Sequence, residues 1–235
     1  MYKGIYIALS GAVLKRRNLD IFAQNIANAN TTGYKKERIS FKDYVVPADN
    51  KNDLNDDGRV MADLSRSIID FSSGALSQTG NPLDVALHGK GLFALEDGKF
   101  TRNGSFMMSS EGYLTTESGL KVLGEGGPVQ LQGNRIDILP SGDIIVDDVI
   151  ADRLKIVDFP DKGVLKKLSE GTFTTEETGE SVNAQVSQGF LETSNVNIIQ
   201  EMVQMLASNR EFESYQKMIH AFDEASSKTI NELGK

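Results

Sequence analysis

Residues 5–29 read IYIALSGAVLKRRNLDIFAQNIANA, and this stretch decides the fold. Apolar residues recur in it every seven positions, with further ones three residues on: Ile5, Ala8, Ala12, Leu19, Phe22, Ile26 and Ala29. This spacing places an apolar stripe along one side of an α-helix, interrupted by Lys15. The following residues, NANTTG at 28–33, are rich in turn formers, so we predict that the helix ends there.

The other end of the chain repeats the pattern over residues 196–233. Its apolar stripe comprises Ile198, Met202, Met205, Phe212, Tyr215, Ile219 and Phe222. Asn197 with Gln200 three residues on predicts a capping box, and Glu201 suits the first turn. A helix of this length spans about 57 Å, more than a small core covers. A buried helix of one globule is the simpler alternative, but the shared pattern favours a helix that packs between subunits.

The middle of the chain alternates instead of following a helical period. Between residues 74 and 189, pairs such as Asp97-Gly98 and Asn103-Gly104 separate short apolar runs, which predicts antiparallel hairpins. Residues 36–73, with a polar stretch at 47–59, are interpreted as a connector or linker. The expected fold is α+β and mainly β. Its antiparallel β-rich central body, 74–189, accompanies a discontinuous, coiled-coil-like helical assembly domain formed by 1–35 and 190–235.

Composition excludes several classes of function. The chain of 235 residues carries a formal net charge of −8, so a nucleic-acid footprint is not expected. It has no cysteine, which excludes disulfides and thiol nucleophiles. No apolar run reaches the roughly 20 residues that span a bilayer, so membrane insertion is not expected. Lys15, Arg16 and Arg17 follow the apolar start, an order that does not suit a cleaved signal peptide.

Residues suited to catalysis are scarce. His88 and His220 are far apart, and the GKG that follows His88 lacks the remaining pattern of a phosphate loop. We expect no enzyme activity, no catalytic residues and no cofactor. Asp53, Asn55 and Asp57 match the first half of a calcium loop, but Leu64 stands where the loop requires a bidentate Glu. A solvated acidic loop is therefore the favoured interpretation, and calcium should bind weakly or not at all.

Three blocks of sequence resemble one family in its order. QNIANANTTGYK at 24–35 is similar to the N-terminal signature of bacterial flagellar rod and hook proteins. The blocks GNPLDVALHGKGLF at 80–93 and FTRNGSF at 100–106 resemble the centre of these proteins. GFLETSNV at 189–196, with Glu201-Met202-Val203 and Arg210, resembles the end. One departure is REFESY at 210–215, where the family often has Arg-Ala-Tyr-Glu followed by Asn.

The resemblance implies a structural subunit of the flagellar basal-body rod. In that family the terminal helices pair in an inner domain that lines a channel, subunits stack helically, and export uses the flagellar type III apparatus without a cleaved signal. Expected partners are further copies and neighbouring rod or hook subunits, in a rod that crosses the periplasm and transmits torque. The turn after the first helix maps to residues 28–35, which adds Asn28, Asn30, Thr32 and Gly33 to the two stripes as expected assembly residues.

Length and the segment ISFKDY at 39–44 look most like the proximal-rod member of the family, with a distal-rod or hook-type protein as the alternative. Two other classes of protein are alternatives. A calcium-binding adhesion module would need a working ligand at Leu64. A β-sandwich hydrolase would need a convergent acid, base and nucleophile. Neither class accounts for two terminal helices of the same kind.

Overall fold

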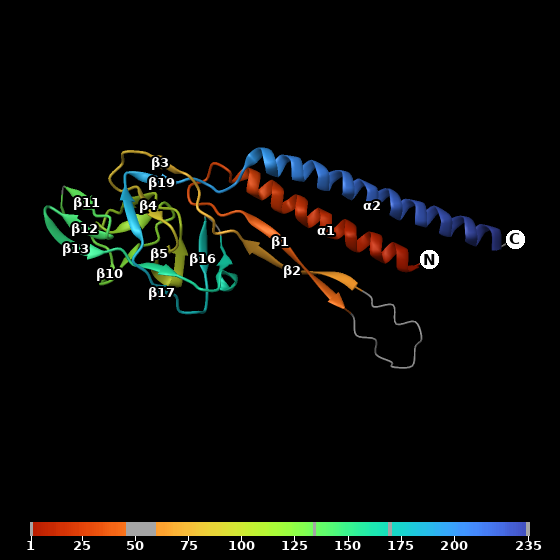
Figure 1. Cartoon of the computed structure of the whole chain (residues 1–235), viewed down its shortest axis with the longest axis horizontal. Coiled ribbons are helices and arrows are strands. Elements are labelled where there is room, and N and C mark those ends of the chain that lie inside the picture. The colour runs from red at the N-terminus through yellow and green to blue at the C-terminus, as the bar shows by residue number, and fades with distance from the viewer. Residues whose placement is uncertain (1, 46–59, 134, 169–170, 234–235) are drawn as a thin grey trace. The chain divides into compact units, whose positions relative to one another are not determined.

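Two long helices and an antiparallel β-rich body make up the chain (Figure 1). The structure, a computed structural model, describes residues 2–45, 60–133, 135–168 and 171–233, and side chains over 4–39, 67–133, 135–168 and 171–228. Helix α1 covers Tyr2–Ala27 and helix α2 covers Ile198–Leu233. The predicted fold class, with helices at both ends, is confirmed.

The chain divides into two compact units, each assembled from distant parts of the sequence. One contains Met1–Ala27, Glu37–Ile68 and Asn197–Lys235, and the other contains Asn28–Lys36 and Ile69–Val196. The first is the helical unit and the second is the β body. The short segment after α1 therefore belongs to the body.

The helical unit also contains a pair of strands that the sequence analysis did not predict. Strand β1 (Glu37–Val45) and strand β2 (Val60–Ile69) form a two-stranded sheet within the segment interpreted as a connector. The candidate calcium residues Asp53, Asn55 and Asp57 fall between these strands and lie outside the described residues. Weak or absent calcium binding therefore stays a prediction.

The body is built on a six-stranded sheet in which every neighbouring pair is antiparallel. Its spatial order is β15 (Lys166–Lys167), β16 (Thr172–Thr174), β6 (Lys99–Thr101), β5 (Leu92–Ala94), β14 (Ile156–Asp158) and β17 (Glu180–Ser181). A short 3₁₀ turn at Glu96–Gly98 joins β5 to β6, with Asp97 at a φ of 59° and Gly98 at 65°. The hairpin predicted at Asp97-Gly98 is thus confirmed.

Smaller antiparallel sheets complete the body. A three-stranded sheet contains β11 (Ile136–Ile138), β12 (Asp143–Val146) and β13 (Val149–Arg153). Strand pairs are β3 (Leu76–Gln78) with β19 (Phe190–Glu192), β4 (Val85–His88) with β18 (Gln185–Gln188), β7 (Phe106–Met108) with β8 (Leu114–Thr116), and β9 (Leu123–Gly124) with β10 (Gly127–Pro128).

Strand β5 supplies both hydrophobic cores because successive strand residues point to opposite faces. Phe93 packs into one core, where its ring meets that of Phe106 edge to face at 5.1 Å. Leu92 and Ala94 pack into the other core with Phe173. The body therefore has its own buried interior, as its fold class requires.

Candidate functional site

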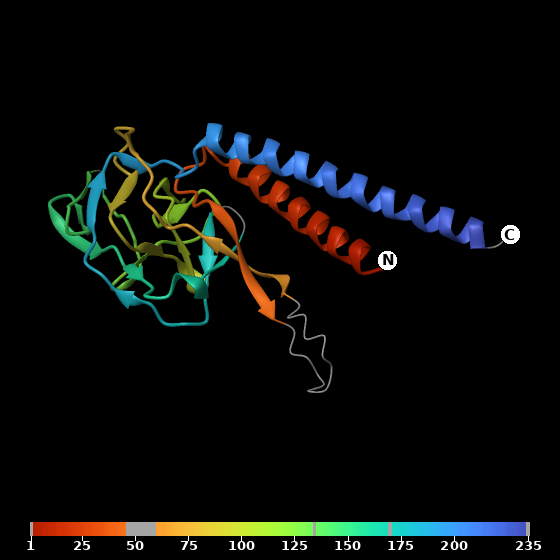
Figure 2. The same ribbon diagram turned by 45° about the vertical axis from the view of Figure 1, so that its right-hand side comes forward.

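The helices α1 and α2 run antiparallel (Figure 2). Small residues set their register. A Cβ added at Gly4 would lie 2.7 Å from the Phe222 ring, and one added at Gly11 would lie 2.6 Å from the Tyr215 ring. Seven residues forward along α1 thus correspond to seven residues back along α2. Each glycine leaves room that an aromatic ring of α2 fills, as in close helix packing generally.

Polar contacts hold the same register. Lys15, which interrupts the apolar stripe in sequence, forms an ion pair with Glu211. Asn25 Nδ2 donates to Glu201 Oε2 at 3.1 Å, and both residues are buried, with 1% and 4% of their surface exposed. Asn25 also joins β1, since its Nδ2 donates to the Glu37 carbonyl at 2.9 Å and its Oδ1 accepts from the Glu37 N–H at 3.0 Å.

The start of α2 follows the predicted cap. The Gln200 N–H donates to Asn197 Oδ1 at 3.1 Å, which satisfies one of the free donors of the first turn. Glu201 lies in that turn, where the helix dipole favours a carboxylate. The cap therefore places the Glu201 carboxylate in front of Asn25.

The predicted assembly residues divide by exposure. Buried are Ala12 and Gly33. Half-buried are Ile5, Leu19, Phe22, Ile26, Asn28, Thr32, Ile198, Met205, Phe212, Tyr215, Ile219 and Phe222. Exposed are Asn30 and Met202. Part of the two stripes is used within the chain, since α1 and α2 pack on each other, and the role of these residues between subunits stays a prediction.

Each helix also carries a second apolar surface, which the sequence analysis did not distinguish. On α1 it consists of Tyr6, Leu9 and Val13, exposed to 65%, 49% and 55%. On α2 it consists of Ile199, Val203 and Leu206, exposed to 77%, 61% and 63%. We call these the outer patches of α1 and α2. Their spacing puts each on the side of its helix turned away from the other helix.

The β body contains a buried charged cluster around Glu192. Glu192 Oε1 accepts from Lys35 Nζ at 2.6 Å and from the Gly74 N–H at 2.7 Å, and its Oε2 accepts from Arg102 Nε at 2.5 Å. The three charged side chains are 1–3% exposed. The remaining donors of Arg102 reach the carbonyls of Leu87, Gly89 and Gly91. We call Lys35, Arg102 and Glu192 the charged cluster.

Backbone hydrogen bonds next to the charged cluster join the segment after α1 to the segment before α2. The Gly33 N–H donates to the Glu192 carbonyl at 2.7 Å, and Gly33 has a φ of 67°. A Cβ there would lie 2.4 Å from the Asn103 nitrogen, so only glycine fits. Asn195 accepts from the Lys36 N–H at 2.8 Å and donates to the carbonyl of Asp70. The chain that leaves α1 and the chain that leads to α2 are therefore tied together inside the body.

Burial and charge act against each other in the cluster. Burial lowers the pKa of Lys35 below its ordinary value, and the hydrogen bond to Glu192 only partly offsets this. Burial raises the pKa of Glu192, but Arg102 and Lys35 together outweigh burial and leave this pKa lowered. Glu192 is thus held as a carboxylate between two cations.

Residues suited to chemistry lie apart in the structure. His88 Nε2 lies 2.7 Å from Ser187 Oγ at the exposed end of β4, and His220 is exposed on α2. Gly89 and Gly91 have φ values of 80° and 121° and form a turn between β4 and β5. Within the described residues, no group of acidic and histidine side chains could hold a metal ion, and no helix is long and apolar enough to cross a bilayer.

The sequence pattern did not indicate the charged cluster as a site, although its three residues stand in the blocks that carry the family resemblance. Lys35 ends the first block, Arg102 lies in FTRNGSF, and Glu192 lies in GFLETSNV. A signal was present in each block, because a charged residue stands among apolar residues and turn formers. The sequence alone does not indicate that residues 35, 102 and 192 contact one another.

Comparison with known proteins shows which family has similar sequence in these parts of the chain. Three family models match: Flagella basal body rod protein at residues 5–35, Flagellar hook protein FlgE/F/G D1 domain at 86–157, and Flagellar basal body rod FlgEFG protein C-terminal at 187–233. The flagellar basal-body rod protein FlgF of Caulobacter vibrioides is 30% identical over 246 residues, covering 100% of this chain and 99% of the relative.

FlgF of Mesorhizobium japonicum is likewise 30% identical, with 100% of this chain and 99% of the relative covered. FlgG of Bacillus subtilis, another basal-body rod protein, is 30% identical over 261 residues, covering 98% of this chain and 99% of the relative. The chain therefore belongs to the flagellar basal-body rod protein family and is a structural subunit of the rod, with no enzymatic role.

Proposed function

We propose that this subunit takes the FlgF-type, proximal position in the rod and assembles with its neighbours through its helix pair. Alignments to FlgF relatives run over 244–246 residues, and those to FlgG relatives run over 254–261, against 235 residues here. The shorter alignments need fewer gaps, which favours the FlgF type. A distal-rod or hook-type position is the alternative.

The two outer patches support assembly, and this observation carries the proposal. In the antiparallel register, Gly11 meets Tyr215 while Asn25 meets Glu201. The α1 patch, residues 6–13, therefore lies near one end of the pair, and the α2 patch, residues 199–206, lies near the other. Two different surfaces that bind head to tail generate a helical filament when the rotation does not close.

The energy available suits a repeating structure. Full burial of one large apolar side chain contributes about 1.5–3 kcal/mol, before the cost of ordering the partners. Three such side chains per patch give a modest contact. A rod repeats this contact at every subunit, so the contacts together stabilise the filament more than one contact stabilises a single pair of subunits. The partners we propose are further copies and the adjoining rod or hook subunits.

Export through the flagellar type III apparatus, without removal of an N-terminal signal, completes the proposal. The helix α1 begins at Tyr2, and Gly4 packs against Phe222. Cleavage of a leader inside this helix would remove part of the surface on which α2 packs. The pair would then line the channel of a rod that crosses the periplasm and transmits torque.

The test compares two charge insertions on α2. Val203→Glu places a carboxylate in the outer patch, and Gln216→Glu adds the same charge at an exposed position outside it. We expect both chains to fold with equal helix content. In a strain that lacks this gene, Gln216→Glu should restore complete basal bodies and swimming, and Val203→Glu should restore neither. Full motility with Val203→Glu would refute the role of the outer patch.

A further inference from the structure

A small cavity borders the charged cluster. Its volume is about 20 Å³. Lys35 and Arg102 line it from the cluster, and Lys90 and Lys162 contribute two more cations. The backbone turn at Gly89–Gly91 and the Phe71 ring form the remainder of its wall. All of these residues belong to the β body, and Lys90 is exposed, so the cavity borders solvent.

Positive charge exceeds negative charge around this cavity. Glu192 pairs with Lys35 and Arg102, and Asp158 pairs with Lys162. Asp70 acts on Lys35 as a third carboxylate. Among the described side chains, four cations thus face three carboxylates. The surplus cation is Lys90, which is exposed, so the excess positive charge lies on the solvent side of the cavity, next to the buried cluster.

Hydrogen-bond donors remain in the same place. A lysine ammonium has three N–H donors and an arginine guanidinium has five. Lys35 gives two of its donors to Glu192 and the Ser72 carbonyl. Arg102 gives four to Glu192 and to the carbonyls of Leu87, Gly89 and Gly91. One donor on each side chain is left beyond these bonds.

We propose that this cavity is a binding site for a small monovalent anion of the size of chloride. A water-sized guest needs about 10–15 Å³ of such volume, so one halide ion fits and a tetrahedral sulfate or phosphate does not. The ion supplies the missing negative charge and accepts the remaining N–H donors. It stabilises the body at the point where the chain segments next to both helices are tied together.

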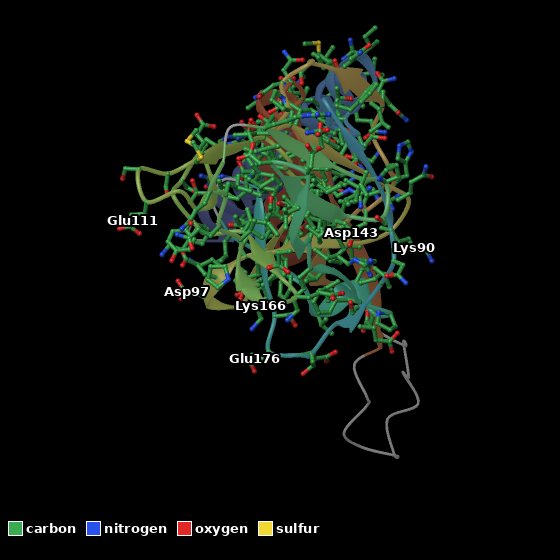
Figure 3. All side chains as sticks on the ribbon, turned by 90° about the vertical axis from the view of Figure 1, so that its left-hand side faces the viewer. Lys90, Asp97, Glu111, Asp143, Lys166 and Glu176 are labelled. Atoms are coloured by element: carbon green, nitrogen blue, oxygen red, sulfur yellow. The ribbon has the colours of Figure 1, made fainter. Side chains whose placement is uncertain are left out.

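The test measures unfolding of the full chain in urea at constant ionic strength, with chloride replaced stepwise by gluconate. Lys90→Gln removes a cation that lines the cavity and takes no part in the charged cluster. Lys166→Gln removes an exposed lysine of β15 that does not line it, and Figure 3 shows Lys90 and Lys166 at separate places on the body. Lys90→Arg keeps the charge and should restore the effect.

Above its dissociation constant, each tenfold rise in chloride should raise the folded-to-unfolded ratio about tenfold in the wild type and in Lys166→Gln. Lys90→Gln should lose most of this dependence. Chloride-35 NMR should show broadening by the wild type that bromide suppresses. Equal stability in chloride and gluconate, or the same chloride dependence in Lys90→Gln, would overturn the proposal. Protection by acetate in place of chloride would also overturn the assignment to a halide. None of these readouts depends on rod assembly.

Discussion

Glu192 joins segments of the β body that are far apart in the sequence. Its carboxylate and its carbonyl together accept hydrogen bonds from Gly33, Lys35, Gly74 and Arg102. A buried ion pair is weak support for net stability, because desolvation of the charges offsets their attraction. Loss of one partner is costly for the same reason, since the charge left behind stays buried and unpaired.

Glu192→Gln should therefore lower the free energy of unfolding by about 3–5 kcal/mol, although the amide keeps nearly the same shape. Glu176→Gln is the matched control, because Glu176 pairs with Lys166 at the surface. Exposed pairs contribute about 0–1 kcal/mol. Urea unfolding of both variants measures the difference, and an equal loss in the two would contradict the importance of the cluster.

The lowered pKa of Glu192 makes the stability of the body sensitive to acid. The folded state holds the Glu192 proton less tightly than the unfolded chain, whose ordinary value is 4.5. The stabilisation is thus fully present above pH 4.5 and is lost as the pH falls through the lower folded value. Carbon-13 NMR of the carboxylates should show the Glu192 pKa below its ordinary value of 4.5. Titration at or above 4.5 would contradict this.

Among the elements, the pairing of α1 with α2 depends on shape as much as on hydrophobicity. Gly4 and Gly11 provide room for Phe222 and Tyr215, a feature that a count of apolar positions does not reveal. The helices were predictable because their apolar stripe recurs at helical spacing. Met202 belongs to the predicted apolar stripe but is exposed, and the polar Asn25 is buried. The register of the two helices, which the apolar spacing does not reveal, decides which residues are in contact.

Gly11→Ala should destabilise the helix pair, although alanine in place of glycine usually stabilises a helix. In an exposed helix, alanine in place of glycine stabilises by about 1 kcal/mol. Here the added Cβ would lie 2.6 Å from the Tyr215 ring, so the ring must leave its place against α1 or the helices must move apart. We expect faster hydrogen exchange in both helices, with recovery in the double variant Gly11→Ala/Tyr215→Ala. Ser10→Ala, at an exposed neighbouring position, is the control. Slower exchange in Gly11→Ala alone would disprove the close approach.

Over the whole molecule, apolar spacing and turn pairs predicted the helices and the hairpin at Asp97-Gly98. Contacts between residues far apart in the sequence were not predicted. Asp97-Gly98 fixes its own turn, so β5 and β6 followed from the sequence. Residues 46–59 separate strands β1 and β2, so no two-residue hairpin loop marked them as a pair, and the segment was interpreted as a connector. The charged cluster joins residues 35, 102 and 192, and no periodicity relates positions so far apart.

Because the two units have separate interiors, a substitution in the helices should block rod assembly without unfolding the β body. Phe212→Asp introduces a carboxylate into the half-buried stripe of α2, where burial of an unpaired charge costs several kcal/mol. The β body should melt as in the wild type, while cells with this variant as the only copy should build no complete rod and not swim. Gln216→Asp is the control and should swim. Normal swimming with Phe212→Asp would remove this stripe from the mechanism.

The register of α1 on α2 has a mechanical consequence. A slip by one heptad, about 10.5 Å, would bring Tyr215 over Gly4, leave Phe222 without its glycine and separate Asn25 from Glu201. A smaller slip would press an aromatic ring against larger side chains. We therefore expect these contacts to resist sliding of the two helices along each other. We expect a shaft built from such pairs to stay stiff along its axis until a threshold load, and then to fail abruptly instead of stretching.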